Sequence, residues 1–203
     1  MKKKANPSKE ELYQFWQNPN KGNEPSKYLN KTERSKFLYE YVQKYVDETA
    51  RILEPGCNVG RNLNYLFEKG YTHLTGIEIN EDAVQLLKEH YPKMSEEIQV
   101  FTGPIEDVIQ SFETNSFDLT FSMAVLEHIH PDSDWIFSEL ARVTKSYLII
   151  IESETWDSDR HFPRNYKKIF ERLGFNQIEE NTDCEGFGES YICRVFKKKK
   201  WFS

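Results

Sequence analysis

Short apolar runs and amphipathic helical segments alternate along the chain from residue 51 to residue 196. Runs of strand length occupy residues 51–54, 74–79, 98–102, 117–122, 147–152, 175–179 and 190–196. Apolar residues at helical spacing predict helices over residues 61–69, 81–90, 105–112, 133–144 and 164–173, and another over 32–46 before the first strand. Regular alternation of this kind makes successive strands parallel, with helices covering both faces of the sheet.

The last part of the chain departs from this alternation. Only a turn-rich stretch, residues 181–189, separates the last two runs, and a connection without a helix predicts an antiparallel pair. The predicted fold is therefore an α/β, Rossmann-like, doubly wound fold with a mostly parallel seven-stranded sheet and an antiparallel last strand. Such sheets bind ligands outside the carboxyl ends of their central strands, so we expect the functional site there.

A polar segment, rich in turns and aromatic residues, precedes the alternating region. We predict that residues 1–46 form an amino-terminal arm and helix, with Thr32 as a candidate helix cap. Residues 47–203 are predicted to form the core, and the two parts to make one structural domain. Trp16, Tyr28 and Arg34 are candidates for a lid over the site.

Composition and charge restrict the partners and the compartment. The net charge of −6 argues against nucleic acid as a partner, and the basic runs at residues 2–4 and 197–200 are typical of solvated charge. Three cysteines without a Cys-x-x-Cys pair indicate a reducing compartment, and no apolar run reaches transmembrane length. We therefore expect a cytoplasmic protein with no membrane partner, while its oligomeric state stays open.

The turn after the first strand gives the strongest indication of a ligand. Glu54, Gly56, Asn58 and Gly60 lie between this strand and the next helix, and Glu78 ends the second strand. Glycines allow a ligand to approach the backbone closely, and a carboxylate at the second strand suits a ribose diol. A dinucleotide and an adenosyl cofactor both fit this arrangement. The glycine spacing differs from Gly-x-Gly-x-x-Gly, and a carboxylate at position 54 repels phosphates but suits an ammonium group, which favours the adenosyl cofactor.

With these residues the chain resembles the class I S-adenosylmethionine-dependent methyltransferases from about residue 51 to about residue 196. Within that family it is most similar to the ubiquinone-biosynthesis-like, small-molecule group, also called methyltransferase type 11. The resemblance implies S-adenosylmethionine as cofactor and S-adenosylhomocysteine as product. The cofactor residues predicted in the core are Glu54, Gly56, Asn58, Gly60, Asn62, Glu78, Ile79, Ile105, Glu106 and Met123.

The resemblance leaves the group near the adenine amine open, and it includes one departure from the usual glycines. The family places an acidic or amide side chain near the adenine amine, and either Glu106 or Asp107 suits that role. Many members carry glycine where this chain has Asn58; asparagine tolerates left-handed backbone angles, so we expect the turn to be retained. Trp16 and Arg34 of the arm complete the predicted cofactor set, with Arg34 facing the cofactor's carboxylate.

Residues 126–131 follow the fourth strand, where the resemblance places the transferred methyl group. Glu127 and His128 are the predicted catalytic residues, with His128 as a base or as an orienting group for the acceptor. The same pair is similar to metal-dependent relatives, including small-RNA 2′-O-methyltransferases, in which His161 would match a further ligand. Those relatives carry another acid where this chain has Ala124, and a missing carboxylate weakens a hard-cation site, so no metal is predicted.

The segment after the fifth strand supplies candidate substrate residues. Arg160, His161 and Arg164 are suited to pairing with an anionic group, and Trp156 offers apolar contact. Tyr28 of the arm joins the predicted substrate set. A surface loop without a function would show the same residue types.

The predicted function is methyl transfer from S-adenosylmethionine to a small-molecule acceptor with an anionic group. An RNA or protein methyltransferase is the first alternative, with the lysine-rich residues 197–200, Arg160 and Arg164 as contacts. A protein that binds the cofactor without catalysis is the second, and a dehydrogenase is the third. The acceptor atom and the pathway stay open.

Overall fold

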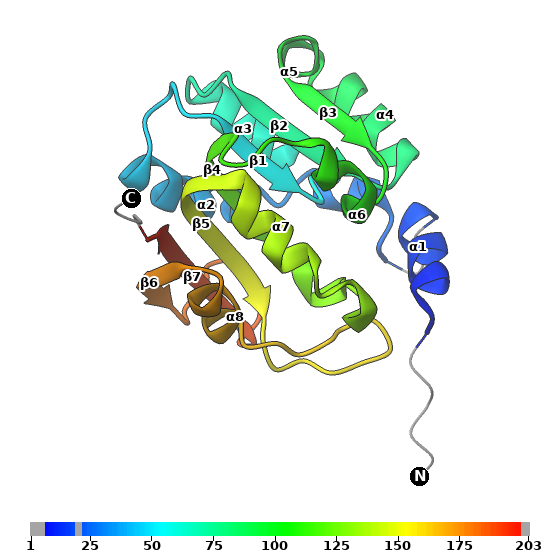
Figure 1. Cartoon of the computed structure of the whole chain (residues 1–203). Coiled ribbons are helices and arrows are strands. Elements are labelled where there is room, and N and C mark those ends of the chain that lie inside the picture. The colour runs from blue at the N-terminus through cyan, green and yellow to red at the C-terminus, as the bar shows by residue number, and fades with distance from the viewer. Residues whose placement is uncertain (1–6, 19–21, 200–203) are drawn as a thin grey trace.

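A seven-stranded mixed sheet forms the centre of the protein in the computed structural model, which describes residues 7–18 and 22–199 (Figure 1). The strands are β1 Ile52–Pro55, β2 Leu74–Glu78, β3 Gln99–Thr102, β4 Phe117–Met123, β5 Thr144–Ser153, β6 Phe175–Asn181 and β7 Tyr191–Lys198. Their order is β3-β2-β1-β4-β5-β7-β6, and β7 runs antiparallel to both of its neighbours while all other neighbouring pairs are parallel. The predicted fold class is confirmed.

Helices cover both faces of this sheet because its central strands are apolar on both sides. Neighbouring strand residues alternate between two cores: Ile52 packs with the layer of α2 and α3, and Leu53 packs with the layer of α7 and α8. The helices are α1 Lys9–Gln17, α2 Thr32–Tyr45, α3 Arg61–Glu68, α4 Glu81–His90, α5 Pro92–Glu97, α6 Ile105–Val108, α7 Ile136–Val143 and α8 Tyr166–Arg172. None of them is long and apolar enough to cross a bilayer, a statement limited to the described residues.

Several helix ends differ from the sequence prediction. Thr32 is the first helical residue of α2 rather than its cap, and Lys31 before it makes no side-chain cap bond. The segment predicted as one helix over residues 105–112 is α6 followed by the 3-10 turn η2 Ile109–Ser111. The α8 helix begins two residues later than predicted, after Asn165 Oδ1 accepts a hydrogen bond from the Lys168 N–H. Such shifts are set by local capping, which apolar periodicity does not encode.

The arm contains a helix that the sequence analysis did not predict. Ser8 and Glu11 form a reciprocal capping box at the start of α1, and the helix buries only Leu12. A second short helical turn, η1 Pro25–Tyr28, follows before α2. Figure 1 shows α1 beside α6, at the edge of the sheet where the parallel strands end. The arm therefore lies next to the expected site, while its action as a lid stays a prediction.

Strand register brings the two predicted acidic residues to one edge of the sheet. Glu54 pairs with Gly76, and Pro55 pairs with Ile77, so Glu78 follows directly beyond the end of the β1 ladder. On the other side of β1, Leu53 pairs with Thr120, and β4 continues to Met123 at the same edge. The ends of β1, β2 and β4 therefore share one rim, as the order of the parallel strands requires.

Candidate functional site

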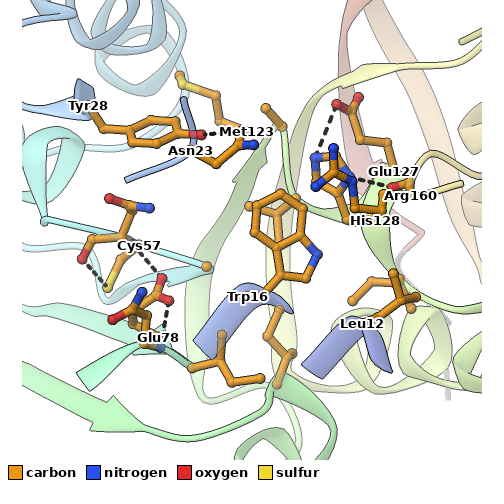
Figure 2. Close-up of a pocket in the computed structure, with 18 of the residues that line it drawn as sticks. Leu12, Trp16, Asn23, Tyr28, Cys57, Glu78, Met123, Glu127, His128 and Arg160 are labelled. Carbon is orange, nitrogen blue, oxygen red and sulfur yellow. Dashed lines mark hydrogen bonds and ion pairs between the residues drawn. The ribbon is translucent and has the colours of Figure 1, made fainter. Parts of the chain in front are cut away.

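A cavity of about 660 Å³ opens at this rim, between the ends of β1, β2 and β4 and the arm. All of the predicted site residues line it except Gly60 and Arg164. Those that line it are Trp16, Tyr28, Arg34, Glu54, Gly56, Asn58, Asn62, Glu78, Ile79, Ile105, Glu106, Met123, Glu127, His128, Trp156, Arg160 and His161. Figure 2 shows Trp16 projecting from α1 into the cavity, between Glu78 on one side and His128 on the other. A space of this size is within the range of small-ligand sites.

The turn after β1, which borders the cavity, has a left-handed backbone at three positions. Gly56, Asn58 and Gly60 have φ angles of 72°, 49° and 70°. A Cβ atom on Gly56 would lie 2.5 Å from the Val125 side chain, so this position has room only for glycine. Asn58 keeps the turn in the left-handed conformation that its residue type allows. Gly60 lies behind the lining and caps α3, whose first N–H groups are free of helical partners.

Glu54 presents an unpaired carboxylate oxygen in the buried part of the cavity. The side chain is 2% exposed, and its Oε1 accepts a hydrogen bond of 2.7 Å from Asn62 Nδ2. Its Oε2 is buried and has no hydrogen-bond partner among the described residues. Burial raises the pKa of Glu54 to about 8. A buried acid with one oxygen unsatisfied is an acceptor prepared for a cationic donor.

Glu78 stands at the end of β2 with both oxygens bound to the backbone. Oε2 accepts from the Asn58 N–H at 2.7 Å, and Oε1 accepts from the Asn80 N–H at 2.9 Å. Burial raises the pKa of this carboxyl group. Each carboxylate oxygen retains a further lone pair, so Glu78 can accept from two more donors without giving up these bonds.

The apolar side chains of Ile79 and Ile105 line the cavity near Glu78, together with Glu106. Tyr13 of α1 joins them, and its burial and the nearby Glu106 carboxylate raise the pKa of the phenol. Sequence analysis missed Tyr13, because the helix that carries it was not predicted. Trp16 on the same helix has a buried Nε1 that finds no acceptor among the described residues.

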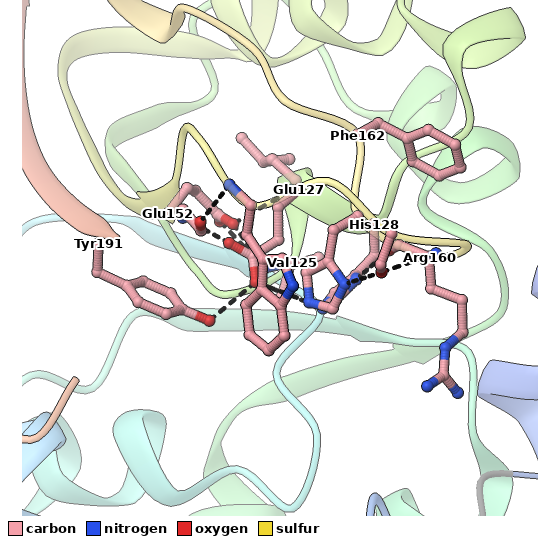
Figure 3. Close-up of polar contacts among 12 residues, drawn as sticks. Val125, Glu127, His128, Glu152, Arg160, Phe162 and Tyr191 are labelled. Atoms are coloured by element: carbon pink, nitrogen blue, oxygen red, sulfur yellow. Dashed lines mark hydrogen bonds and ion pairs between the residues drawn. The ribbon is translucent and has the colours of Figure 1, made fainter. Parts of the chain in front are cut away.

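The turn after β4 is shaped by a buried carboxylate from the neighbouring strand. Glu152 near the end of β5 accepts hydrogen bonds from Ser122 Oγ at 2.6 Å, from the Val125 N–H at 2.9 Å and from the Glu127 N–H at 3.2 Å (Figure 3). Burial, and then the charge of Glu127, raises the pKa of Glu152 to about 8. Glu152 was not predicted as a site residue; its position fixes the 3-10 turn η3 Leu126–His128.

Glu127 and His128 meet on the side of the cavity that lies across Trp16 from Glu78 (Figure 2). Glu127 Oε1 accepts a hydrogen bond of 2.8 Å from the Tyr191 hydroxyl and lies 3.6 Å from His128 Nε2. His128 Nδ1 lies 2.6 Å from the backbone oxygen of Arg160; because that oxygen only accepts, Nδ1 carries the proton. Burial lowers the pKa of His128 to about 3, so the imidazole stays neutral and keeps a lone pair on Nε2.

Aromatic and cationic side chains border the same end. The ring of Trp156 stacks on His161 with centroids 4.2 Å apart, and Trp156 itself is 52% exposed. The Arg160 guanidinium lies 4.0 Å from the Phe15 ring centroid, which connects this loop with α1. Arg34 donates from Nε to the Gly186 backbone oxygen at 2.8 Å. Within the described residues, its Nη1 and Nη2 atoms donate no hydrogen bond.

Arg164, which was predicted to contact the substrate, does not line the cavity. Its guanidinium donates to the backbone oxygens of Leu126 and Ile129 and to Asp134, the last at 2.7 Å. Its side chain is 7% exposed. The guanidinium is thus occupied by contacts within the fold that hold the loop after η3.

Comparisons with known proteins identify the domain and its fold. Residues 53–150 match the family model described as a methyltransferase domain. The structure of 1,6-didemethyltoxoflavin-N1-methyltransferase from Burkholderia thailandensis, solved with S-adenosylhomocysteine, is 13% identical. The match covers 94% of this chain and 87% of the other chain, with a TM-score of 0.70. Residues 53–150 thus form a methyltransferase domain, and the fold is that of the class I S-adenosylmethionine-dependent methyltransferases.

The curated relatives that this chain matches have names that indicate different acceptors. The ribosomal protein L11 methyltransferase of Thermotoga neapolitana is 23% identical over 145 residues, which cover 71% of this chain and 51% of the relative. The 24-methylenesterol C-methyltransferase 3 of Arabidopsis thaliana is 28% identical over 127 residues, which cover 61% of this chain and 34% of the relative. The chain thus spans about half of the first relative and a third of the second. S-adenosylmethionine is the family's cofactor, whereas acceptors range from a ribosomal protein to sterols.

Proposed function

We propose that this methyltransferase transfers the methyl group of S-adenosylmethionine to a small-molecule acceptor that carries an anionic group. The observation that supports it most is the unpaired Oε2 of Glu54 beside the left-handed turn, in one cavity with Glu78. The cofactor carries an ammonium group, a carboxylate, a ribose diol and an adenine, and each has a complement in this lining.

The cofactor half of the proposal assigns one contact to each chemical group. Glu54 would accept from the ammonium group, and Glu78 would accept from the ribose hydroxyls with its remaining lone pairs. Ile79 and Ile105 supply apolar surface for adenine, with Glu106 available to its amine. Arg34, whose Nη1 and Nη2 atoms make no hydrogen bond within the described residues, would pair with the cofactor's carboxylate.

The acceptor half of the proposal concerns the end of the cavity at Glu127 and His128. When bound, S-adenosylmethionine supplies an already activated sulfonium methyl, so the chain has to align the acceptor and receive its proton. The neutral His128 offers an Nε2 lone pair to an acceptor N–H or O–H. Arg160 stands nearby as a cation suited to an anionic group on the acceptor.

Two of the charged groups named as contacts in an RNA-binding alternative, Lys198 and Arg164, are used within the fold. Lys198 Nζ donates to Asn115 Oδ1 and to the backbone oxygens of Ala141 and Thr144. Arg164 is occupied in the same way by the loop after η3. Lys200 and residues 2–4 lie outside the described residues. These contacts favour a small acceptor over RNA.

Acceptor class can be tested by following a labelled methyl group. We expect the protein, given tritiated S-adenosylmethionine and separate pools of small metabolites, ribosomal proteins and RNA, to label an anionic small molecule. Arg160→Ala should lower kcat/KM for that acceptor by about 10–100-fold, because a charge-assisted hydrogen bond is lost, and leave cofactor affinity unchanged. The control Arg172→Ala, at the exposed end of α8, should change neither. Label found in ribosomal proteins or RNA instead would overturn the acceptor class.

Cofactor binding should release a proton, and the release should depend on pH. In the free protein the pKa of Glu54 is about 8, so the carboxyl group is mostly protonated at pH 7. An ammonium group at Oε2 favours the ionised form, and the proton then leaves to the buffer. We expect release of most of one proton at pH 7 and almost none at pH 9, where Glu54 is already ionised.

Calorimetry in two buffers of different ionisation enthalpy measures this release. Glu54→Gln should abolish the release and weaken binding, while the control Glu68→Gln, on the exposed side of α3, should retain both. Equal proton release by the wild type and Glu54→Gln would show that Glu54 does not face the ammonium group.

A further inference from the structure

Three side chains with metal-ligating atoms converge beside the acceptor end of the cavity. Glu127 Oε1 lies 3.6 Å from His128 Nε2 and 3.8 Å from His161 Nε2, and one ligand atom from each residue lies within 4.8 Å of the other two. Their side chains are 1%, 15% and 14% exposed, so the cluster is largely shielded but reachable from the cavity. His161 comes from a loop 33 positions beyond His128 in sequence.

The atoms of these residues that face away from the cluster are held by other groups. His128 Nδ1 donates to the Arg160 backbone oxygen, and His161 Nδ1 lies 2.7 Å from Ser158 Oγ. Residues 158 and 161 also pair through their backbones as an isolated bridge, which fixes the loop that carries the second imidazole. Outer partners of this kind set the ring orientation of metal-binding histidines.

Glu127 is held in the same manner. Its Oε2 accepts from the Ser153 N–H, and the Tyr191 hydroxyl donates to Oε1. Behind it, Glu152 places a second buried carboxylate against the same turn. A dication placed between the imidazoles and Glu127 would compensate the charge of the buried Glu127 carboxylate.

We propose that Glu127, His128 and His161 bind a divalent transition-metal cation, with zinc as the representative ion. Two imidazole nitrogens and one carboxylate oxygen, with a position left open, are a donor set found in catalytic zinc sites, whereas magnesium and calcium prefer oxygen-only sets. Ala124 withholds the further carboxylate that a hard cation would require, and the remaining nitrogen-rich set selects a softer ion.

The observed spacing is close to what such an ion requires. With bonds of about 2.0–2.1 Å at tetrahedral angles, neighbouring ligand atoms lie about 3.3 Å apart. The separations of 3.6 and 3.8 Å between Glu127 Oε1 and the two imidazole Nε2 atoms therefore need to close by only a few tenths of an ångström. The open coordination position would face the cavity; if the proposed methyl transfer is correct, it would hold an oxygen or nitrogen of the acceptor. With the ion bound, the lone pair of His128 Nε2 would be engaged by the metal, and the ion would assist loss of the acceptor's proton in its place.

Metal binding to the whole chain, without cofactor, tests this site independently of the proposed function. We expect chelator-treated protein to bind one zinc ion per chain by calorimetry and elemental analysis, and excess magnesium not to displace it. Ser158→Ala should weaken binding by about 10–100-fold, as loss of an outer partner does, and His161→Ala by at least as much. The control His90→Ala, on the exposed end of α4, should leave affinity unchanged.

Cobalt absorption spectra provide a second readout that does not depend on the stability of any variant. Cobalt bound to the wild type should show the intense visible bands of a four-coordinate site, which zinc should abolish by displacement. The proposal would be overturned if the wild type bound less than one zinc ion per chain, or if folded His161→Ala bound zinc with the affinity of the wild type. A cobalt spectrum identical to that of the fully hydrated ion would also overturn it. S-adenosylmethionine binding by the same samples separates this outcome from a failure of the cofactor site.

Discussion

Replacing Glu78 by alanine is expected to weaken S-adenosylmethionine binding by about 100-fold or more. The side chain can accept from two ribose hydroxyls, and hydrogen bonds to a charged group contribute about 1.5–3 kcal/mol each. Its two oxygens also bind the Asn58 and Asn80 N–H groups, so the substitution additionally loosens the turn that faces the cofactor. Calorimetry of the wild type and of Glu78→Ala measures the loss.

A ligand without ribose hydroxyls separates the direct contact from this effect on the turn. The wild type should bind S-adenosylhomocysteine far more tightly than its 2′,3′-dideoxy analogue, and Glu78→Ala should discriminate little between the two. Glu81→Ala, at the exposed first position of α4, is the matched control and should bind as the wild type does. Full discrimination retained by Glu78→Ala would remove this residue from the ribose contact.

Replacing Gly60 by alanine should lower the free energy of unfolding by about 2–4 kcal/mol. A left-handed backbone costs a residue with a Cβ atom about 1–2 kcal/mol, and overpacking of a core costs about 1–3 kcal/mol. Both apply here, because φ is 70° and the added Cβ would lie 2.4 Å from Leu87 Cδ1. Urea unfolding followed by circular dichroism gives the difference.

Gly188→Ala is the matched control for this change. A Cβ atom there meets nothing within 4 Å, so the free energy of unfolding should change by no more than about 0.5 kcal/mol. If Gly60→Ala unfolded as the control does, the packing of α4 against the cofactor turn would differ from the one described.

The parts of the fold that the sequence predicted correctly are those that depend on local pattern. The five-residue apolar run that ends at Ile151 predicts a buried strand wherever it lies, and the glycine-containing turn after β1 predicts a strand-to-helix connection. The α1 helix was missed although Leu12, Phe15 and Trp16 lie at helical spacing, because the turn-rich residues around them favoured an irregular arm. Its capping box, Ser8 with Glu11, was a further signal.

The parts of the site that the sequence could not predict depend on contacts between distant segments. The sequence predicts Glu152 as an ordinary strand residue. Its hydrogen bonds with Ser122 and with the turn at Val125 exist only because β4 and β5 end together. Arg164 reads as a cavity residue, yet backbone oxygens from the loop after η3 take up its guanidinium. Which acceptors surround a long cationic side chain is decided by tertiary packing.

A crystal structure with S-adenosylhomocysteine tests most directly whether the cavity is the cofactor site. We expect the ribose hydroxyls to donate to the carboxylate of Glu78 and the ammonium group to donate to Oε2 of Glu54. The sulfur should lie beside Met123. Trp16 should remain against the ligand or move aside with α1. Electron density for the nucleoside at another place, or a fully occupied ligand that contacts neither Glu54 nor Glu78, would contradict this assignment.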